Sequence, residues 1–167
     1  MLILGIDPGT ATTGYGLIEQ NGDSTKVVTW GLIETDKNGL KENRLQVIHE
    51  RTLELLVTHN PDLFVIEKVF FSTNVKTAIA VGQAQGVMLL AASNHKVKVV
   101  EYAPGTIKKV ITGSGRANKK EVQKAIRKIL GARIKSEAHK KTHFDNAADA
   151  LAIAMTHVLK GGEDMNV

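Results

Sequence analysis

The sequence of 167 residues contains no cysteine and few aromatic side chains. The lack of cysteine excludes a disulfide scaffold, a zinc finger and a thiol nucleophile. Seven aromatic residues are too few for a surface that binds single-stranded nucleic acid by base stacking. No apolar run approaches the ~18 residues that a membrane span requires, and residues 1–6 have no basic region of the kind that begins a signal peptide. We therefore expect a soluble, cytoplasmic protein without membrane contact.

Positive charge is concentrated in one part of the chain. Twelve of the 22 lysine and arginine residues lie in residues 103–142, together with only two acidic residues. This basic segment carries +10, whereas the rest of the chain carries −5. A solvated, lysine-rich helix face is one interpretation, and a surface that binds a polyanion is the stronger one. With so few aromatic residues, the favoured ligand is the backbone of structured nucleic acid.

The hydrophobic pattern predicts one α/β domain with a mixed sheet. Strands are expected at residues 2–7, 14–19, 27–35, 63–67 and 97–102, with a turn at residues 21–23. Helices are expected around residues 45–56, 74–94, 103–111, 119–130 and 145–159. The order of elements predicts a five-stranded sheet flanked by helices over residues 1–160. A flexible C-terminal tail is expected at residues 161–167.

Two apolar strands each end in an acidic residue. Asp7 follows Leu-Gly-Ile, and Glu67 follows Phe-Val-Ile. Ligands of open α/β sheets bind at the carboxyl ends of strands, so both positions favour a functional site. The alternatives are a turn opened by Asp7 before Pro8-Gly9 and an ion pair between Glu67 and Lys68.

A third acidic group lies at residues 145–149, at the predicted start of an apolar helix. Asp145 is equally well interpreted as a helix N-cap. Asp149 stands between two alanines of the helix, and packing does not explain a carboxylate there. Several converging carboxylates favour hard divalent cations over zinc, because the chain has no HExxH pair.

Together, the carboxylates and the basic segment predict a metal-dependent nuclease. The lysines would bind the phosphodiester backbone, and the carboxylates would hold Mg²⁺. Two such ions, about 3.5–4 Å apart, activate water and stabilise the leaving oxygen. This chemistry needs no protein nucleophile, in agreement with the lack of cysteine and of a GxSxG motif.

Three motifs in this order resemble the RuvC family of Holliday-junction endonucleases, within the RNase H-like superfamily. They are the glycine-rich residues 5–16, the segment 66–86 beginning Ile-Glu-Lys-Val-Phe-Phe, and the residues 149–154, Asp-Ala-Leu-Ala-Ile-Ala. The resemblance covers residues 1–160 and implies an RNase H-like fold. It further implies a homodimer that makes paired symmetric nicks in a four-way DNA junction during recombination and repair, leaving 5′-phosphate ends. The implied partners are RuvA and RuvB, and the implied cofactor is Mg²⁺, two ions per subunit, with Mn²⁺ as a substitute.

The resemblance also implies roles for individual residues. Asp7, Glu67 and Asp149 match catalytic metal ligands, with Asn146 and Asp145 as further ligand candidates. The aromatic residue Phe70 matches one that inserts among bases, and Lys108 and Lys119 match residues important for cleavage. The candidate DNA-binding residues are Phe70, Phe71, Lys76, Lys108, Lys109, Arg116, Lys119 and Lys120. Core packing is the alternative for the two phenylalanines, and general electrostatic attraction is the alternative for the lysines.

Asn146 departs from the family pattern, which has Asp or His three residues before the last aspartate. An amide oxygen ligates a metal ion more weakly than a carboxylate does, because it carries no charge. Three explanations compete. In the first, Asn146 is native and Asp145 takes over its role. In the second, Asn146 is native and is a weaker ligand, and in the third it is an introduced Asp→Asn change. We favour the third explanation slightly, because the neighbouring motif is otherwise intact.

Small residues recur every fourth position at Ala78, Gly82 and Gly86. They allow another helix to approach closely, either from a second copy of the chain or from the chain's own sheet. The resemblance favours a dimer, because a resolvase needs two active sites related by a two-fold axis.

Three other functions remain open. The first is an RNA-processing nuclease of the same fold. The second is an actin-like ATPase, which shares a similar first loop but needs a second domain to enclose nucleotide. The third is a junction-binding form that Asn146 has made catalytically silent.

Overall fold

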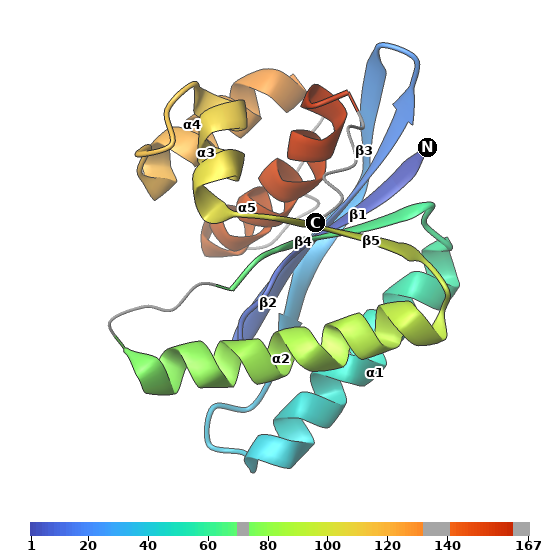
Figure 1. The fold of residues 1–167 in the computed structure, drawn as a ribbon, viewed down its shortest axis with the longest axis vertical. Coiled ribbons are helices and arrows are strands. Elements are labelled where there is room, and N and C mark those ends of the chain that lie inside the picture. The colour runs from blue at the N-terminus through green and yellow to red at the C-terminus, as the bar shows by residue number, and fades with distance from the viewer. Residues whose placement is uncertain (70–73, 132–140, 162–167) are drawn as a thin grey trace.

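A mixed five-stranded sheet forms the centre of the molecule, with helices on both faces (Figure 1). The computed structural model describes residues 1–69, 74–131 and 141–161, without the side chains of residues 141–146. The elements, in chain order, are β1 (Leu2–Asp7), β2 (Thr12–Asn21), β3 (Ser24–Glu34), α1 (Lys41–His59), β4 (Leu63–Glu67), α2 (Val75–Asn94), β5 (Lys98–Tyr102), α3 (Pro104–Thr112), α4 (Lys119–Leu130) and α5 (Lys141–Leu159).

The strand order is β3-β2-β1-β4-β5, and the sheet combines two pairing modes. Strands β1, β2 and β3 form an antiparallel meander, in which β2 and β3 are joined by a tight turn at Gly22 with φ of +57°. Strand β4 pairs parallel to both β1 and β5. A parallel neighbour requires a crossover, and α1 and α2 supply the two crossovers. The mixed sheet predicted from the sequence is confirmed.

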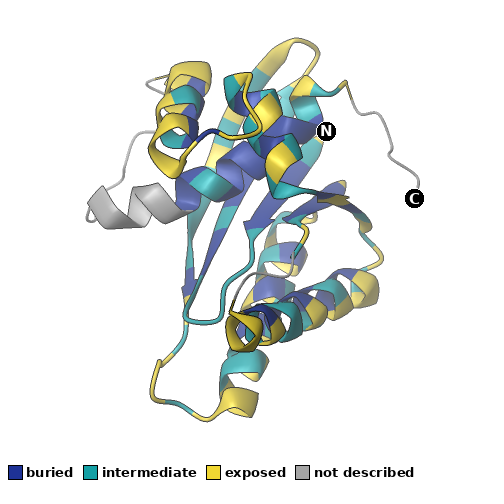
Figure 2. Ribbon diagram, turned by 60° about the vertical axis from the view of Figure 1, so that its left-hand side comes forward, coloured by how far each residue is buried: buried dark blue, intermediate teal, exposed yellow. Residues whose placement is uncertain are grey.

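The two faces of the sheet carry separate hydrophobic cores. On β1, Leu4 and Ile6 face the core under α1 and α2, whereas Ile3 faces the core under α3, α4 and α5. This alternation follows from the two-residue period of a strand. It places Asp7 on the same face as Ile3, on the side of α5. Figure 2 shows α5 as a largely buried helix over its described residues, in contrast to the exposed outer sides of the other helices.

Helix α5 lies unusually close to the sheet because glycines and alanines meet there. Gly5 on β1 pairs with Gly16 on β2. A methyl group at Gly5 would collide with the carbonyl oxygen of Ala150, and one at Gly16 would lie 2.7 Å from a Leu151 methyl carbon. The helix contributes buried alanines at positions 147, 148, 150, 152 and 154. The glycines of the first motif therefore let α5 approach the two central strands.

The structure corrects some predicted boundaries. Helix α5 begins at Lys141, not at Asp145, so Asp145 and Asn146 lie inside the helix and Asp145 is not its N-cap. Strands β2 and β3 extend further than predicted, because their ladder continues as far as Asn21 and Ser24 beside the turn. The tail predicted at residues 161–167 lies almost entirely outside the described residues and stays a prediction.

Helix α2 also corrects the expectation that no segment is apolar enough to span a membrane. Among the described residues it is the one helix whose length and composition meet that criterion. Such evidence is weak, because the core helices of soluble proteins meet it too. One side of α2 is buried, including Ala84, Met88 and Ala92, and packs in the core shared with α1. The opposite side exposes Val75, Ile79 and Leu90.

Candidate active site

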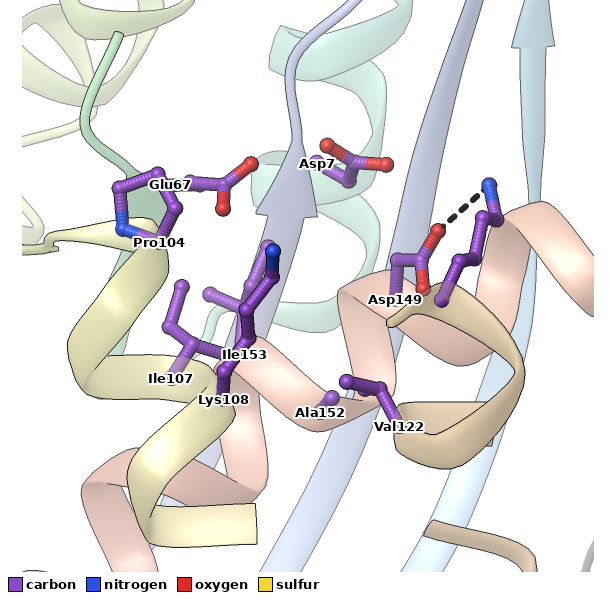
Figure 3. Close-up of a pocket in the computed structure, with 10 residues that line it drawn as sticks. Asp7, Glu67, Pro104, Ile107, Lys108, Val122, Asp149, Ala152 and Ile153 are labelled. Carbon is purple, nitrogen blue, oxygen red and sulfur yellow. Dashed lines mark ion pairs between the residues drawn. The ribbon is translucent and has the colours of Figure 1, made fainter. Parts of the chain in front are cut away.

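One pocket gathers three predicted carboxylates and two predicted lysines (Figure 3). It has a volume of about 180 Å³ and lies at the end of β1 and β4, between α3, α4 and α5. Its charged lining residues are Asp7, Glu67, Lys108, Lys119 and Asp149. Its remaining wall consists of Pro104, Ile107, Val122, Ala152 and Ile153. Segments from both ends of the chain thus meet at one charged pocket with an apolar floor.

The sheet register explains why the first two carboxylates meet. Strands β1 and β4 are parallel neighbours, and Ile6 is the partner of Ile66. Asp7 and Glu67 each follow these residues, so they end adjacent strands at the same level and on the same face. Asp149 comes from α5, one residue before Ala150, which lies against Gly5. The close approach of α5 to the sheet therefore brings the third carboxylate to the other two.

Burial and neighbouring carboxylates raise the pKa values of Asp7 and Glu67. The pKa of Asp7 is raised to about 7, mainly because burial penalises its charge and further because Glu67 and Asp149 repel it. The pKa of Glu67 is also raised, first by burial and then by Asp149. Lys119 lowers both pKa values, and Lys108 lowers that of Glu67. Such an arrangement of like charges favours the binding of cations.

Lys119 is held at the pocket by the start of α4. Asn118 caps this helix in a capping box, in which its side chain accepts from the Glu121 amide and the Glu121 carboxylate accepts from the Asn118 amide. The next residue is Lys119, whose Nζ lies 2.8 Å from Oδ2 of Asp149 (dashed line in Figure 3). The cap thus fixes the backbone at the position from which this lysine reaches the carboxylate.

The donor set of the pocket fits a hard divalent cation. Three carboxylates supply oxygen ligands, which are the ligands that Mg²⁺, Mn²⁺ and Ca²⁺ prefer. The repulsion that raises the pKa of Asp7 is relieved when a cation binds. In the part of the chain that the structure describes, no three acidic or histidine side chains are already arranged around one ion position. Instead, an ammonium group contacts Asp149.

The other predicted site residues lie outside this pocket or outside the described residues. Lys109, Arg116 and Lys120 are exposed on or beside α3 and α4, and Lys76 is exposed in the first turn of α2. Phe70 and Phe71 fall outside the described residues. Asn146 and Asp145 lie on α5, but their side chains are not among those described. The roles predicted for these four residues stay predictions.

Two features near the site were not predicted. Gln85 of α2 is buried beneath the end of β4, and its Nε2 donates to Oε1 of Glu101 at 2.6 Å and to the carbonyl oxygen of Glu67 at 3.5 Å. Gln85 belongs to the second sequence motif, but its contacts with Glu101 and Glu67 depend on tertiary packing and could not be predicted. The second feature is a hollow of about 550 Å³ beside α4, with a rim that includes Arg116, Lys124 and Lys128.

Comparison with known proteins agrees with this geometry. A family model described as crossover junction endodeoxyribonuclease RuvC matches residues 3–157. The chain belongs to the RuvC family. A family member from Thermosipho melanesiensis is 46% identical over 92% of this chain and 94% of its own length. Another, from Halothermothrix orenii, is 43% identical over 94% of this chain and 92% of its own.

A solved structure extends the RuvC comparison to three dimensions. Thermus thermophilus RuvC in complex with a Holliday junction substrate has a TM-score of 0.83 and 33% sequence identity. The match covers 97% of this chain and 95% of that chain. The chain therefore has the RNase H-like fold of the RuvC family, as the motifs predicted. Family membership also implies dependence on a divalent metal ion.

Proposed function

We propose that this protein is a crossover junction endodeoxyribonuclease that resolves Holliday junctions by paired symmetric nicks. The observation that carries this proposal is the meeting of Asp7, Glu67 and Asp149 in one pocket with Lys108 and Lys119. The pocket opens beside the most basic segment of the chain. Members of the same family carry the name of this activity at 43–46% identity.

The chemistry of the pocket suits phosphodiester hydrolysis. Divalent ions bound by the carboxylates, which we take to be two Mg²⁺ per subunit with Mn²⁺ as a substitute, would activate water and stabilise the leaving oxygen. Asp7 ends β1, which lies beside β4 and beneath α5, so it would be close to ions held by Glu67 and by Asp149. Lys108 and Lys119 supply positive charge for the phosphate as negative charge develops. The products would carry 5′-phosphate ends that a ligase can seal.

The DNA would lie along α3 and α4, against the basic segment. Lys109, Arg116 and Lys120 are exposed there, and Lys124 and Lys128 extend the positive surface along α4. These side chains are suited to phosphate contacts, which fix position without reading sequence. Phe70, Phe71 and Lys76 belong to the chain around the start of α2, which we place near the crossover of the junction.

We further propose that the active form is a homodimer built on α2. Its exposed Val75, Ile79 and Leu90 form an apolar side, and added methyl groups at Gly82 and Gly86 would meet no atom within 4 Å. Ala78, in contrast, is buried in this structure. Sedimentation equilibrium is expected to give a dimer at micromolar concentration, and a monomer would contradict the proposal.

The family relationship supports a proposal about the cellular setting. We propose a cytoplasmic protein that acts in recombination and DNA repair, with RuvA and RuvB as partners. The observation in support is the relationship over residues 3–157. Co-purification of the protein with a junction-bound RuvA–RuvB complex tests this partnership.

The decisive experiment compares this chain with its Asn146→Asp variant on a symmetric four-way DNA junction. Position 146 lies on α5 one turn before Asp149, so a carboxylate there adds a charged ligand candidate to the site. We expect Mg²⁺-dependent nicking by the variant to exceed that of the present chain by orders of magnitude. Equal rates would remove the case for Asn146 as a weakened ligand.

The same assay distinguishes the other functions. A junction that is bound but not cut by this chain, and cut by Asn146→Asp, supports a catalytically silent form. Cleavage of structured RNA in preference to the junction would support an RNA-processing nuclease and contradict the proposed substrate.

A further inference from the structure

The contact between Lys119 and Asp149 joins two groups that the proposed function uses for different purposes. Nζ of Lys119 lies 2.8 Å from Oδ2 of Asp149, while the pocket also holds Asp7 and Glu67. In the proposed function, Asp149 binds metal and Lys119 binds phosphate. In this structure the two groups form an ion pair with each other.

A divalent cation bound to the same oxygen would lie close to the ammonium. Metal–oxygen distances for such ions are about 2.0–2.6 Å, shorter than the lysine contact. The ammonium and the metal ion are both positively charged, so they repel each other when they approach one oxygen together. The two cations are therefore alternatives at Oδ2 of Asp149.

The lysine is the weaker and more mobile of the two competitors. Its side chain is 55% exposed, and that of Asp149 is 22% exposed. An ion pair with an exposed lysine is weak, because solvent screens the charge and the long side chain loses conformational freedom. Because the capping box of Asn118 and Glu121 holds the backbone of α4, the side chain can leave Asp149 without unfolding the helix.

We propose that Lys119 serves as a stand-in cation for Asp149, and that binding of a divalent ion releases its ammonium to a substrate phosphate. The inference rests on the proposed function. Without metal, Lys119 compensates part of the negative charge of the pocket and occupies a ligand position. With metal bound, the ammonium leaves Asp149 but stays at the pocket, where it can contact a substrate phosphate. Metal binding and phosphate binding are thereby coupled through one side chain.

Metal affinity measured without DNA tests the exchange. Mn²⁺ binding is measured by electron paramagnetic resonance and calorimetry for the unchanged chain, for Lys119→Met and for Lys120→Met. Lys120 is the matched control, because it is the next residue of α4, is exposed, and does not line the pocket. We expect Lys119→Met to bind Mn²⁺ about threefold to fivefold more tightly, since it removes a bound competitor. Lys120→Met removes the same charge and should change affinity less than about twofold.

A second measurement uses the unmodified protein and does not depend on the folding of a variant. The ¹⁵N resonance of the Lys119 ammonium group is followed by NMR while Mg²⁺ is added. Its shift should move with the occupancy of the metal site, while that of Lys120 stays constant. An unchanged Lys119 signal at saturating Mg²⁺, or equal Mn²⁺ affinities for the two variants, overturns the exchange.

The outcomes separate this inference from the proposed function. If the unchanged chain binds Mn²⁺ and cuts the junction but Lys119→Met binds no more tightly than Lys120→Met, only the exchange fails. If neither the unchanged chain nor Lys119→Met binds Mn²⁺ at millimolar concentration, the metal-dependent function fails as well.

Discussion

At the scale of single residues, the buried charge of Asp7 lowers the stability of the folded protein. Asp7 ends a buried strand, and burial with two neighbouring carboxylates raises its pKa to about 7. The unfolded chain has the ordinary value of 3.8. Between these values the folded state binds more protons than the unfolded state, so the stability of the metal-free protein falls as pH rises from about 4 to about 7.

Removing this charge should stabilise the protein and abolish cutting. We expect Asp7→Asn to increase the free energy of unfolding in EDTA at pH 8 by roughly 2–4 kcal/mol, with little difference near pH 4. Urea denaturation at both pH values measures the effect, and Mg²⁺-dependent nicking should be lost. Asp23→Asn is the control, because Asp23 is exposed beside the β2–β3 turn. A variant no more stable than the unchanged chain at pH 8 would contradict the electrostatic account of the pocket.

At the scale of elements, the closeness of α5 to the sheet determines whether the three carboxylates meet. Gly5 and Gly16 are paired across β1 and β2, and both leave room for α5. The helix places Ala150 and Ala154 over Gly5, and Leu151 over Gly16. This packing, and not the local sequence around Asp149, brings Asp149 to the end of β1.

Gly5→Ala should therefore damage both stability and the site. The added methyl group meets the Ala150 carbonyl and the Ala154 side chain, so α5 must move outward. We expect a loss of about 2–4 kcal/mol in unfolding free energy and weaker Mn²⁺ binding by the protein that remains folded. Gly105→Ala on α3 is the matched control, because its methyl group would meet nothing within 4 Å. A neutral effect at Gly5 would show that α5 adjusts without cost.

The elements also show what the sequence can and cannot predict. The apolar runs before Asp7 and Glu67 predicted both the strands and the acids at their ends, since strand ends are marked locally. The start of α5 was missed, because residues 141–143 are polar and Phe144 alone marks no apolar face there. The Lys119–Asp149 pair was also missed, because two helices that are separate in sequence meet only in the folded molecule.

At the scale of the whole molecule, the division of charge in the sequence becomes a division of tasks. Residues 104–130 of the basic segment form α3, α4 and the turn between them, beside a pocket of carboxylates contributed by the acidic remainder of the chain. A carboxylate pocket repels phosphate until cations compensate it, so the basic helices must supply the attraction that brings DNA to it. Binding and cutting should therefore be separable by mutation.

Salt dependence gives the sharpest test of that separation. Arg116→Gln, Lys124→Gln and Lys128→Gln combined remove three charges that line the hollow beside α4. Each phosphate contact contributes about 0.9 to the slope of log affinity against log salt, so the slope should flatten by about 2–3. Fluorescence anisotropy with a labelled junction in Ca²⁺ measures it. The control combines Lys26→Gln, Lys37→Gln and Lys41→Gln, which change the net charge equally at exposed positions outside the basic segment. Equal slope changes for both triple variants would show that net charge, rather than this surface, holds the DNA.

Glu67→Gln should instead leave junction affinity nearly intact and abolish nicking.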